Sequence, residues 1–219
     1  MSGYRAEKAG FAKEVQDKLA GKFDKVEAAK TLRWIKSLPA DGAQPAEYTN
    51  AVGQIPNGIQ EVEMGAYQKY LSNGLVLGYL MHALQPGFVK FTTKTWQVSD
   101  KPVFETSRQR ERIGVFLDFC SKYGVSSAFM FQTDQLYEAT NLTQVIVCLS
   151  QVGVEAQSKP GYRGPQDFWM HKHQENKRNF SEEKLRAGET VIGLQMGTNK
   201  GANASGISFG AQRHINDMH

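Results

Sequence analysis

The residue types best suited to chemistry lie near the C-terminus, but their spacing does not complete a catalytic or metal site. His171 and His173 form a His-x-His pair that could supply two metal ligands, yet no cysteine or third ligand lies nearby in a zinc-binding spacing. Residues 197–200 superficially resemble a phosphate-binding loop, but they lack the Gly-x-x-x-x-Gly-Lys-Ser/Thr pattern and follow no predicted strand. No nucleophile has an adjacent base, and no pair of acids converges. The sequence therefore predicts a protein that is not an enzyme and binds no metal or cofactor.

The charge balance favours an acidic partner but not a nucleic acid. The chain has 26 basic and 22 acidic residues, a net charge of +4 and a pI near 9.0, which suits an acidic surface. Nucleic-acid binders usually concentrate Lys and Arg in dense stripes, whereas acidic residues are interspersed along this chain. We therefore expect no nucleic-acid partner.

Cysteine usage and hydropathy predict a cytoplasmic protein. Cys120 and Cys148 lie within apolar helical patterns, which is typical of buried thiols in a reducing compartment. Residues 1–36 alternate charged and apolar residues and lack the features of a signal peptide. Since no run approaches the roughly 20 apolar residues that span a bilayer, we expect no membrane insertion.

The most distinctive segment is the glycine-rich tail at residues 191–215. It is too short to bury a core of its own, because chains below about 40 residues usually need disulfides, metals or partners to fold. Its apolar residues must therefore dock on the rest of the chain or become ordered on an external surface. Its glycines allow close backbone approach to a partner. Lys200, Arg213 and His214 could contact carboxylates.

Upstream of this tail, apolar periodicity predicts a compact all-α domain at residues 24–158. The expected helices cover residues 26–38, 75–84, 134–139 and 142–157, together with a helix that is capped by Thr106 or Ser107 and ends before Gly124. Residues 40–65 lack periodicity and predict a long irregular surface connection. Trp34 is expected to be a packing anchor of the core, and Trp96 an anchor of the irregular segment 88–102. No strand pattern is sustained.

Residues 159–190 predict a basic linker between this domain and the tail. Pro and Gly residues break the helical pattern after residue 159, and five basic against two acidic side chains give residues 159–180 a net charge of +3. Residues 181–186 are expected to form a short helix that is capped by Ser181.

The residues of the tail resemble a known family. The run IGLQMGTNKGA, followed by Gly206-Ile207-Ser208 and Arg213-His214-Ile215, is similar to the calponin-like repeat of calponins, transgelins and their invertebrate muscle relatives. Upstream, the runs LQPG, ERIGVFLDFCSKYGV and DQLYEATNLTQV resemble successive landmarks of the calponin-homology domain. The resemblance covers residues 24–215.

This resemblance implies an N-terminal extension (1–23), a helical calponin-homology domain (24–158), a basic linker (159–190) and a calponin-like repeat (191–215). It implies a cytoskeletal protein that binds actin filaments and stabilises, bundles or regulates them, with a role in muscle contraction as one version. The alternatives are a signalling adaptor that uses the helical domain and, third, homotypic packing. Tropomyosin, calmodulin or a kinase are left open as further partners. The expected actin-binding residues are Lys172, Lys177, Arg178, Gly193, Leu194, Gln195, Met196, Gly197, Asn199, Lys200, Gly201, Gly206, Arg213 and His214.

Two positions and one segment depart from the family pattern. Arg112 stands where the family often has Asn, so a polar contact of the domain is expected to differ. Asn203 stands where the repeat commonly has a phosphorylatable Ser, which leaves Ser205 and Ser208 as candidates for modification. The segment 40–65 is longer than the usual first loop.

Overall fold

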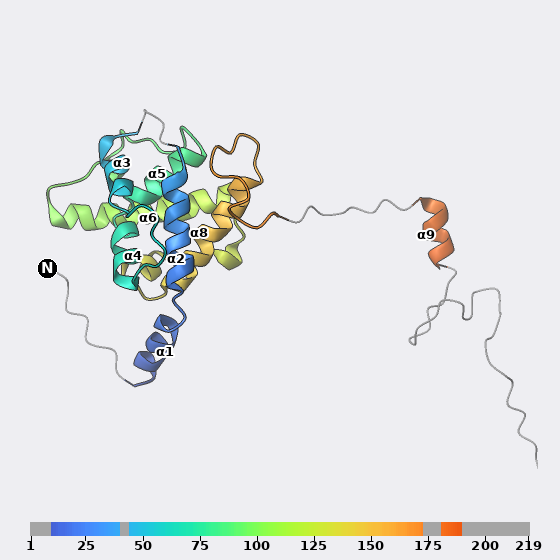
Figure 1. The fold of residues 1–219 in the computed structure, drawn as a ribbon, viewed down its shortest axis with the longest axis horizontal. Helices are drawn as coiled ribbons and strands as arrows, with labels where there is room; N and C mark the ends of the chain where they lie inside the picture. Colours follow the sequence, from blue (N-terminus) through green and yellow to red (C-terminus); the bar gives the residue numbers. More distant parts are fainter. Residues whose placement is uncertain (1–9, 40–43, 173–180, 190–219) are drawn as a thin grey trace, which may run out of the picture. The chain divides into compact units, whose positions relative to one another are not determined.

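The computed structural model describes residues 10–39, 44–172 and 181–189 (Figure 1). The chain divides into two units, residues 1–172 and residues 173–219, and each is described by itself. Regular structure in the described residues is entirely helical, which confirms the predicted all-α class. None of these described helices is long and apolar enough to cross a lipid bilayer.

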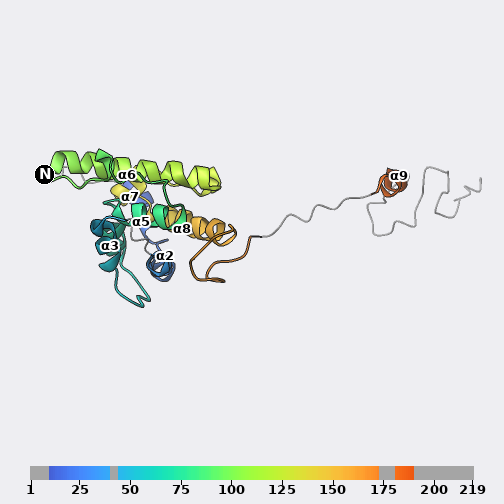
Figure 2. The same cartoon turned by 90° about the horizontal axis from the view of Figure 1, so that it is seen from above.

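The first unit contains eight α-helices and two short 3₁₀ helices in its described residues. In chain order they are α1 (Phe11–Ala20), α2 (Lys25–Ser37), α3 (Ala46–Gly53), α4 (Met64–Leu71), α5 (Leu75–Leu84), η1 (Lys94–Trp96), α6 (Pro102–Tyr123), η2 (Ser127–Phe129), α7 (Thr133–Tyr137) and α8 (Leu142–Gln157). Figure 2 shows α6 across one side of this unit, α5 and α8 beneath it, and α2 and α3 on the opposite side. The second unit contains α9 (Glu182–Glu189).

The core forms around α5 and α2, as their apolar patterns predict. In α5, every residue from Val76 to Ala83 is buried, so this helix is surrounded by the others. In α2, Asp24 caps the helix by accepting hydrogen bonds from the backbone N–H groups of Val26 and Glu27, at 2.9 and 3.0 Å. Trp34 is fully buried and is a packing anchor, as predicted.

The prediction of an irregular connection at residues 40–65 is wrong for its central part. Helix α3 lies within it, packs against α5, and buries Tyr48, Ala51 and Val52. Ile55, just beyond the helix, is also fully buried. These four residues follow a helical spacing of three and four, which the Gly, Pro and Asn residues around them obscure.

The predicted start of the longest helix is also wrong. Helix α6 begins at Pro102 rather than after Thr106 or Ser107. A proline at the first position of a helix loses no hydrogen bond, because that N–H has no partner within the helix, and its fixed φ suits the helix. The predicted end is confirmed: Gly124 terminates α6 in the left-handed conformation, with φ of 111°.

The last helix of the first unit agrees with its sequence pattern. Helix α8 covers Leu142–Gln157, and the Asn141 side chain accepts a hydrogen bond from the backbone N–H of Gln144, as expected for its cap. Cys120 and Cys148 are both buried free thiols. Burial raises the pKa of Cys120, which keeps this thiol protonated.

Candidate functional site

Of the predicted actin-binding residues, Lys172 falls within the described part of the chain. Lys177, Arg178 and the residues of the repeat from Gly193 to His214 lie outside the described residues. The site can therefore be built up to the point where the linker leaves the helical unit. That approach is made by residues 159–172, which we call the docked arm because they lie against α2 and α8 rather than forming a free linker.

Trp169 anchors the docked arm in a niche between α2 and α8. Its side chain is 5% exposed and meets Trp34 edge to face, with ring centroids 5.6 Å apart. On α8, Gly153 provides the space: a Cβ at this position would lie 2.1 Å from Nε1 of Trp169. The ammonium of Lys30 lies 5.0 Å from the centre of the Trp169 ring. A tryptophan therefore fits this niche only because α8 carries a glycine there.

Three hydrogen bonds fix the arm, two at the backbone of Trp169 and one near the start of the arm. The side-chain amide of Gln157 donates to the carbonyl of Trp169 at 3.0 Å and accepts from its backbone N–H at 3.1 Å, as a neighbouring strand would. At the start of the arm, Nε1 of Trp34 donates to the hydroxyl oxygen of Tyr162 at 2.8 Å. Burial raises the pKa of Tyr162, so its hydroxyl stays neutral at physiological pH. The arm thus has a defined path from α8 to residue 172.

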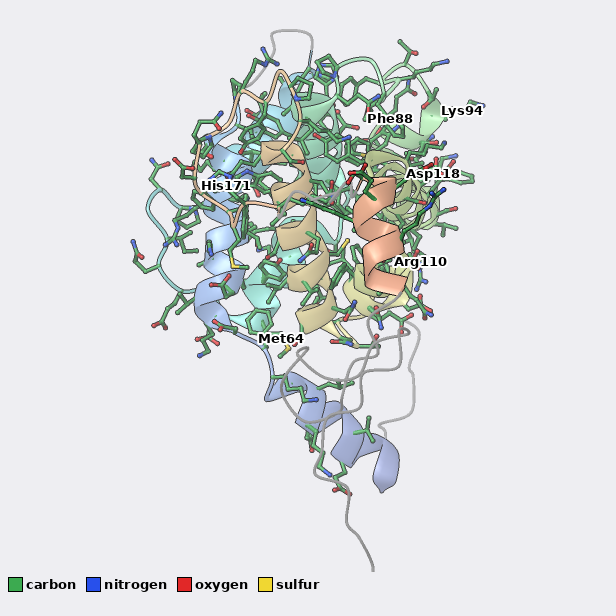
Figure 3. All side chains as sticks on the ribbon, turned by 90° about the vertical axis from the view of Figure 1, so that its right-hand side faces the viewer. Met64, Phe88, Lys94, Arg110, Asp118 and His171 are labelled. Carbon is green, nitrogen blue, oxygen red and sulfur yellow. The ribbon has the colours of Figure 1, made fainter. Side chains whose placement is uncertain are left out.

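At the end of the arm, Lys172 is paired with an acidic residue of the domain. Its ammonium lies 2.7 Å from a carboxylate oxygen of Glu155 on α8, whose side chain is 15% exposed. The preceding residue, His171, is labelled in Figure 3. Its Nε2 atom lies 2.6 Å from a carboxylate oxygen of Asp167 within the arm. Lys172 is therefore not an isolated cation. This ion pair could not be predicted from a local pattern, because Glu155 is 17 residues away in the sequence.

A small cavity of about 250 Å³ lies where the arm leaves α8, between the ends of α2, α5 and α6. Its lining includes Tyr123, Lys159 and Tyr162. The ammonium of Lys159 lies 4.3 Å from the centre of the Tyr123 ring, and burial raises the pKa of Tyr123 to about 12. Within residues 10–39, 44–172 and 181–189, no cluster of three or more His, Cys, Asp and Glu residues could hold a metal ion.

Comparisons with known proteins find family matches for both the helical unit and the C-terminal tail. Residues 25–157 match the family described as the calponin homology (CH) domain, and residues 192–215 match the calponin family repeat. The chain is 34% identical over 209 residues to myophilin of Echinococcus granulosus, covering 95% of this chain and 96% of that protein. It is 31% identical over 209 residues to Calponin-2 of Bos taurus and of Homo sapiens, covering 95% of this chain and 58% of each relative.

Among solved structures, the calponin-homology domain of Rng2 from Schizosaccharomyces pombe is 21% identical, covers 80% of this chain and 87% of that one, and gives a TM-score of 0.42. The family assignment depends on the two family matches and on the relatives, which are 34% and 31% identical to this chain over 209 residues. The chain therefore belongs to the calponin family, with a calponin homology domain followed by a calponin family repeat.

Proposed function

We propose that this protein binds actin filaments through its C-terminal repeat and the basic residues before it, and so stabilises, bundles or regulates them. The match of residues 192–215 to the calponin family repeat carries this proposal. Membership of the calponin family supports a cytoskeletal binding role rather than an enzymatic one. A finer version of this proposal is that the protein modulates muscle contraction. Tropomyosin, calmodulin or a kinase are its further candidate partners.

The proposed mechanism has an electrostatic step and an ordering step. Lys177 and Arg178 are attracted to acidic patches of the filament, and Lys172 adds to this attraction once it leaves Glu155. The repeat then orders against the filament, with Leu194 and Met196 as apolar contacts and its glycines allowing close backbone approach. A single repeat binds more weakly than several linked repeats, which gain avidity from adjacent subunits.

The test is co-sedimentation with actin filaments at two salt concentrations. Deletion of residues 188–219 should sharply reduce pelleting of the protein, and higher salt should weaken binding of the full chain, since exposed charges are screened over about 8 Å at physiological ionic strength. The matched control is a variant in which residues 191–215 are scrambled, because it keeps length and charge while destroying the repeat. Undiminished pelleting of the deletion variant would show that the filament-binding site lies elsewhere.

A further inference from the structure

A shallow groove of about 360 Å³ lies beside the docked arm, on the outer side of α2. Its lining combines an apolar surface with basic and small polar residues: Arg33, Lys36, Ser37, Pro56, Asn57, Gly58, Pro165 and Phe168. Two of these residues are cations and none is an acid. The groove belongs to the helical unit, so the proposed action of the repeat makes no use of it.

The walls of the groove are held in place before any ligand arrives. Nη1 of Arg33 donates to the carbonyl of Ile59 at 2.9 Å and to the side chain of Gln60 at 2.8 Å, and Lys36 donates to the carbonyl of Ile55. These bonds use only some of the N–H donors of each cation, so others are left for a ligand. On the opposite wall, Phe168 packs edge to face on the buried Trp169, with centroids 5.2 Å apart. Such preorganisation lowers the entropic cost of binding.

We propose that this groove binds an acidic peptide segment of a partner protein that presents one large apolar side chain between carboxylates. The apolar side chain would lie on Phe168, Pro165 and Pro56, while flanking carboxylates meet Arg33 and Lys36. The volume lies near the lower end of the roughly 300–1,000 Å³ found for ligand pockets, which suits one anchoring side chain. This inference does not depend on filament binding, and it gives the helical domain a partner of its own.

The shape and charge of the groove favour a peptide over a membrane surface. Binding to a bilayer interface relies on apolar side chains that protrude into the lipid. Here Pro165 and Phe168 are partly buried. The most exposed large apolar side chains of the described chain, Val103 and Met170, do not line the groove. Because the lining holds two cations and no acid among the described residues, charge complementarity indicates an acidic peptide.

The experiment measures binding of a fluorescein-labelled heptapeptide, a phenylalanine with three aspartates on each side, to the full-length protein by fluorescence anisotropy. Asn57→Glu places a carboxylate at the groove, and Asn50→Glu makes the same change at an exposed position of α3 outside it. Both variants carry the same net charge, so non-specific attraction to the basic chain is equal. Asn57→Glu should weaken binding about tenfold, whereas Asn50→Glu should change it less than about twofold.

A second peptide with glycine in place of the phenylalanine tests the apolar contact, and it should bind about tenfold more weakly. Amide chemical-shift changes on adding the first peptide should include Ser37, Gly58 and Phe168. Equal effects of the two variants, equal binding of the two peptides, or shift changes confined to other residues would each overturn the proposal. If anionic vesicles bind the protein but not its Asn57→Glu variant, and the peptide does not bind, the groove would be assigned to a membrane surface instead.

Discussion

Replacement of Arg112 by methionine should strongly destabilise the helical unit. Arg112 is fully buried on α6, and its guanidinium ties three separate segments together. It donates to the backbone carbonyls of Asn73, Thr95 and Gln97 at 2.9, 2.7 and 3.0 Å. It also forms an ion pair with Glu105 at 2.7 Å. These contacts take the place of the polar contact that an asparagine would make at this position. They hold η1 and the start of α5 against α6.

The expected loss follows from the groups that Arg112→Met leaves behind. Methionine matches much of the side-chain volume, so little cavity forms and most of the effect is electrostatic. Glu105, with a side chain only 15% exposed, would keep its charge without the guanidinium. Removing one partner of a buried ion pair typically costs about 3–5 kcal/mol. For a domain of this size, that loss lowers the melting temperature by roughly 6–20 °C.

Urea unfolding of the full-length protein, followed by circular dichroism, measures this change. The matched control is Arg108→Met, since Arg108 is on the same helix but donates one bond, to the carbonyl of Gln97 at 2.8 Å. Its loss should cost less than about 1 kcal/mol. The double variant Arg112→Met with Glu105→Leu should cost less than the sum of its two single variants, because no charge is left unpaired. A loss below about 1 kcal/mol for Arg112→Met, or strict additivity, would refute the argument.

Three further predictions concern the aromatic contacts of the first unit. Trp34→Ala should cost about 3–5 kcal/mol in urea unfolding, because it leaves a large cavity and removes a partner of the docked arm; a loss under about 1 kcal/mol would show that the core does not depend on it. Gly153→Ala should force Trp169 out of its niche and red-shift the tryptophan emission, whereas Gly114→Ala, where a Cβ meets nothing within 4 Å, should leave the emission unchanged. Burial raises the pKa of Tyr123 to about 12, so the Tyr123 hydroxyl ionises in the unfolded state before it does in the folded state. The contribution of Tyr123 to stability is therefore present below pH 10, declines above pH 10 and is lost by pH 12. Tyr123→Phe should flatten this decline in the free energy of unfolding measured from pH 9 to 12.

The sequence predicted those helices whose apolar residues are dense, as in α5, or whose apolar spacing is supported by a cap. Helix α8 has both signals, Asn141 at its cap and an uninterrupted apolar face, and its bounds are as predicted. Helix α3 has a similar apolar spacing, but Pro45 and the glycines around it suggested a loop. In α3, burial of Tyr48 against α5, Phe91 and Trp96 outweighs weak local propensity, and such tertiary packing is not visible in a local pattern.

The course of the docked arm could not be predicted for a related reason. Its composition, with Pro160, Gly161 and several basic residues, is typical of a linker. What holds it is a set of contacts between distant residues: Trp34 with Tyr162, and Gly153 and Gln157 with Trp169. The interleaved aromatic residues were the available signal, since an exposed linker has little reason to carry a tryptophan.

The docked arm also changes what should be expected of Lys172. Glu155 already lies 2.7 Å from the ammonium of Lys172 and offsets its charge, so the net gain from a filament carboxylate at this position is small. Because Glu155 is mostly buried, Lys172→Ala should loosen the end of the arm, seen as faster amide exchange at Trp169, while filament affinity falls little. Lys177→Ala, in the part of the linker beyond the arm, should instead lower the affinity and its salt dependence. An equal loss of affinity for the two variants would show that the ion pair with Glu155 does not persist when the filament binds.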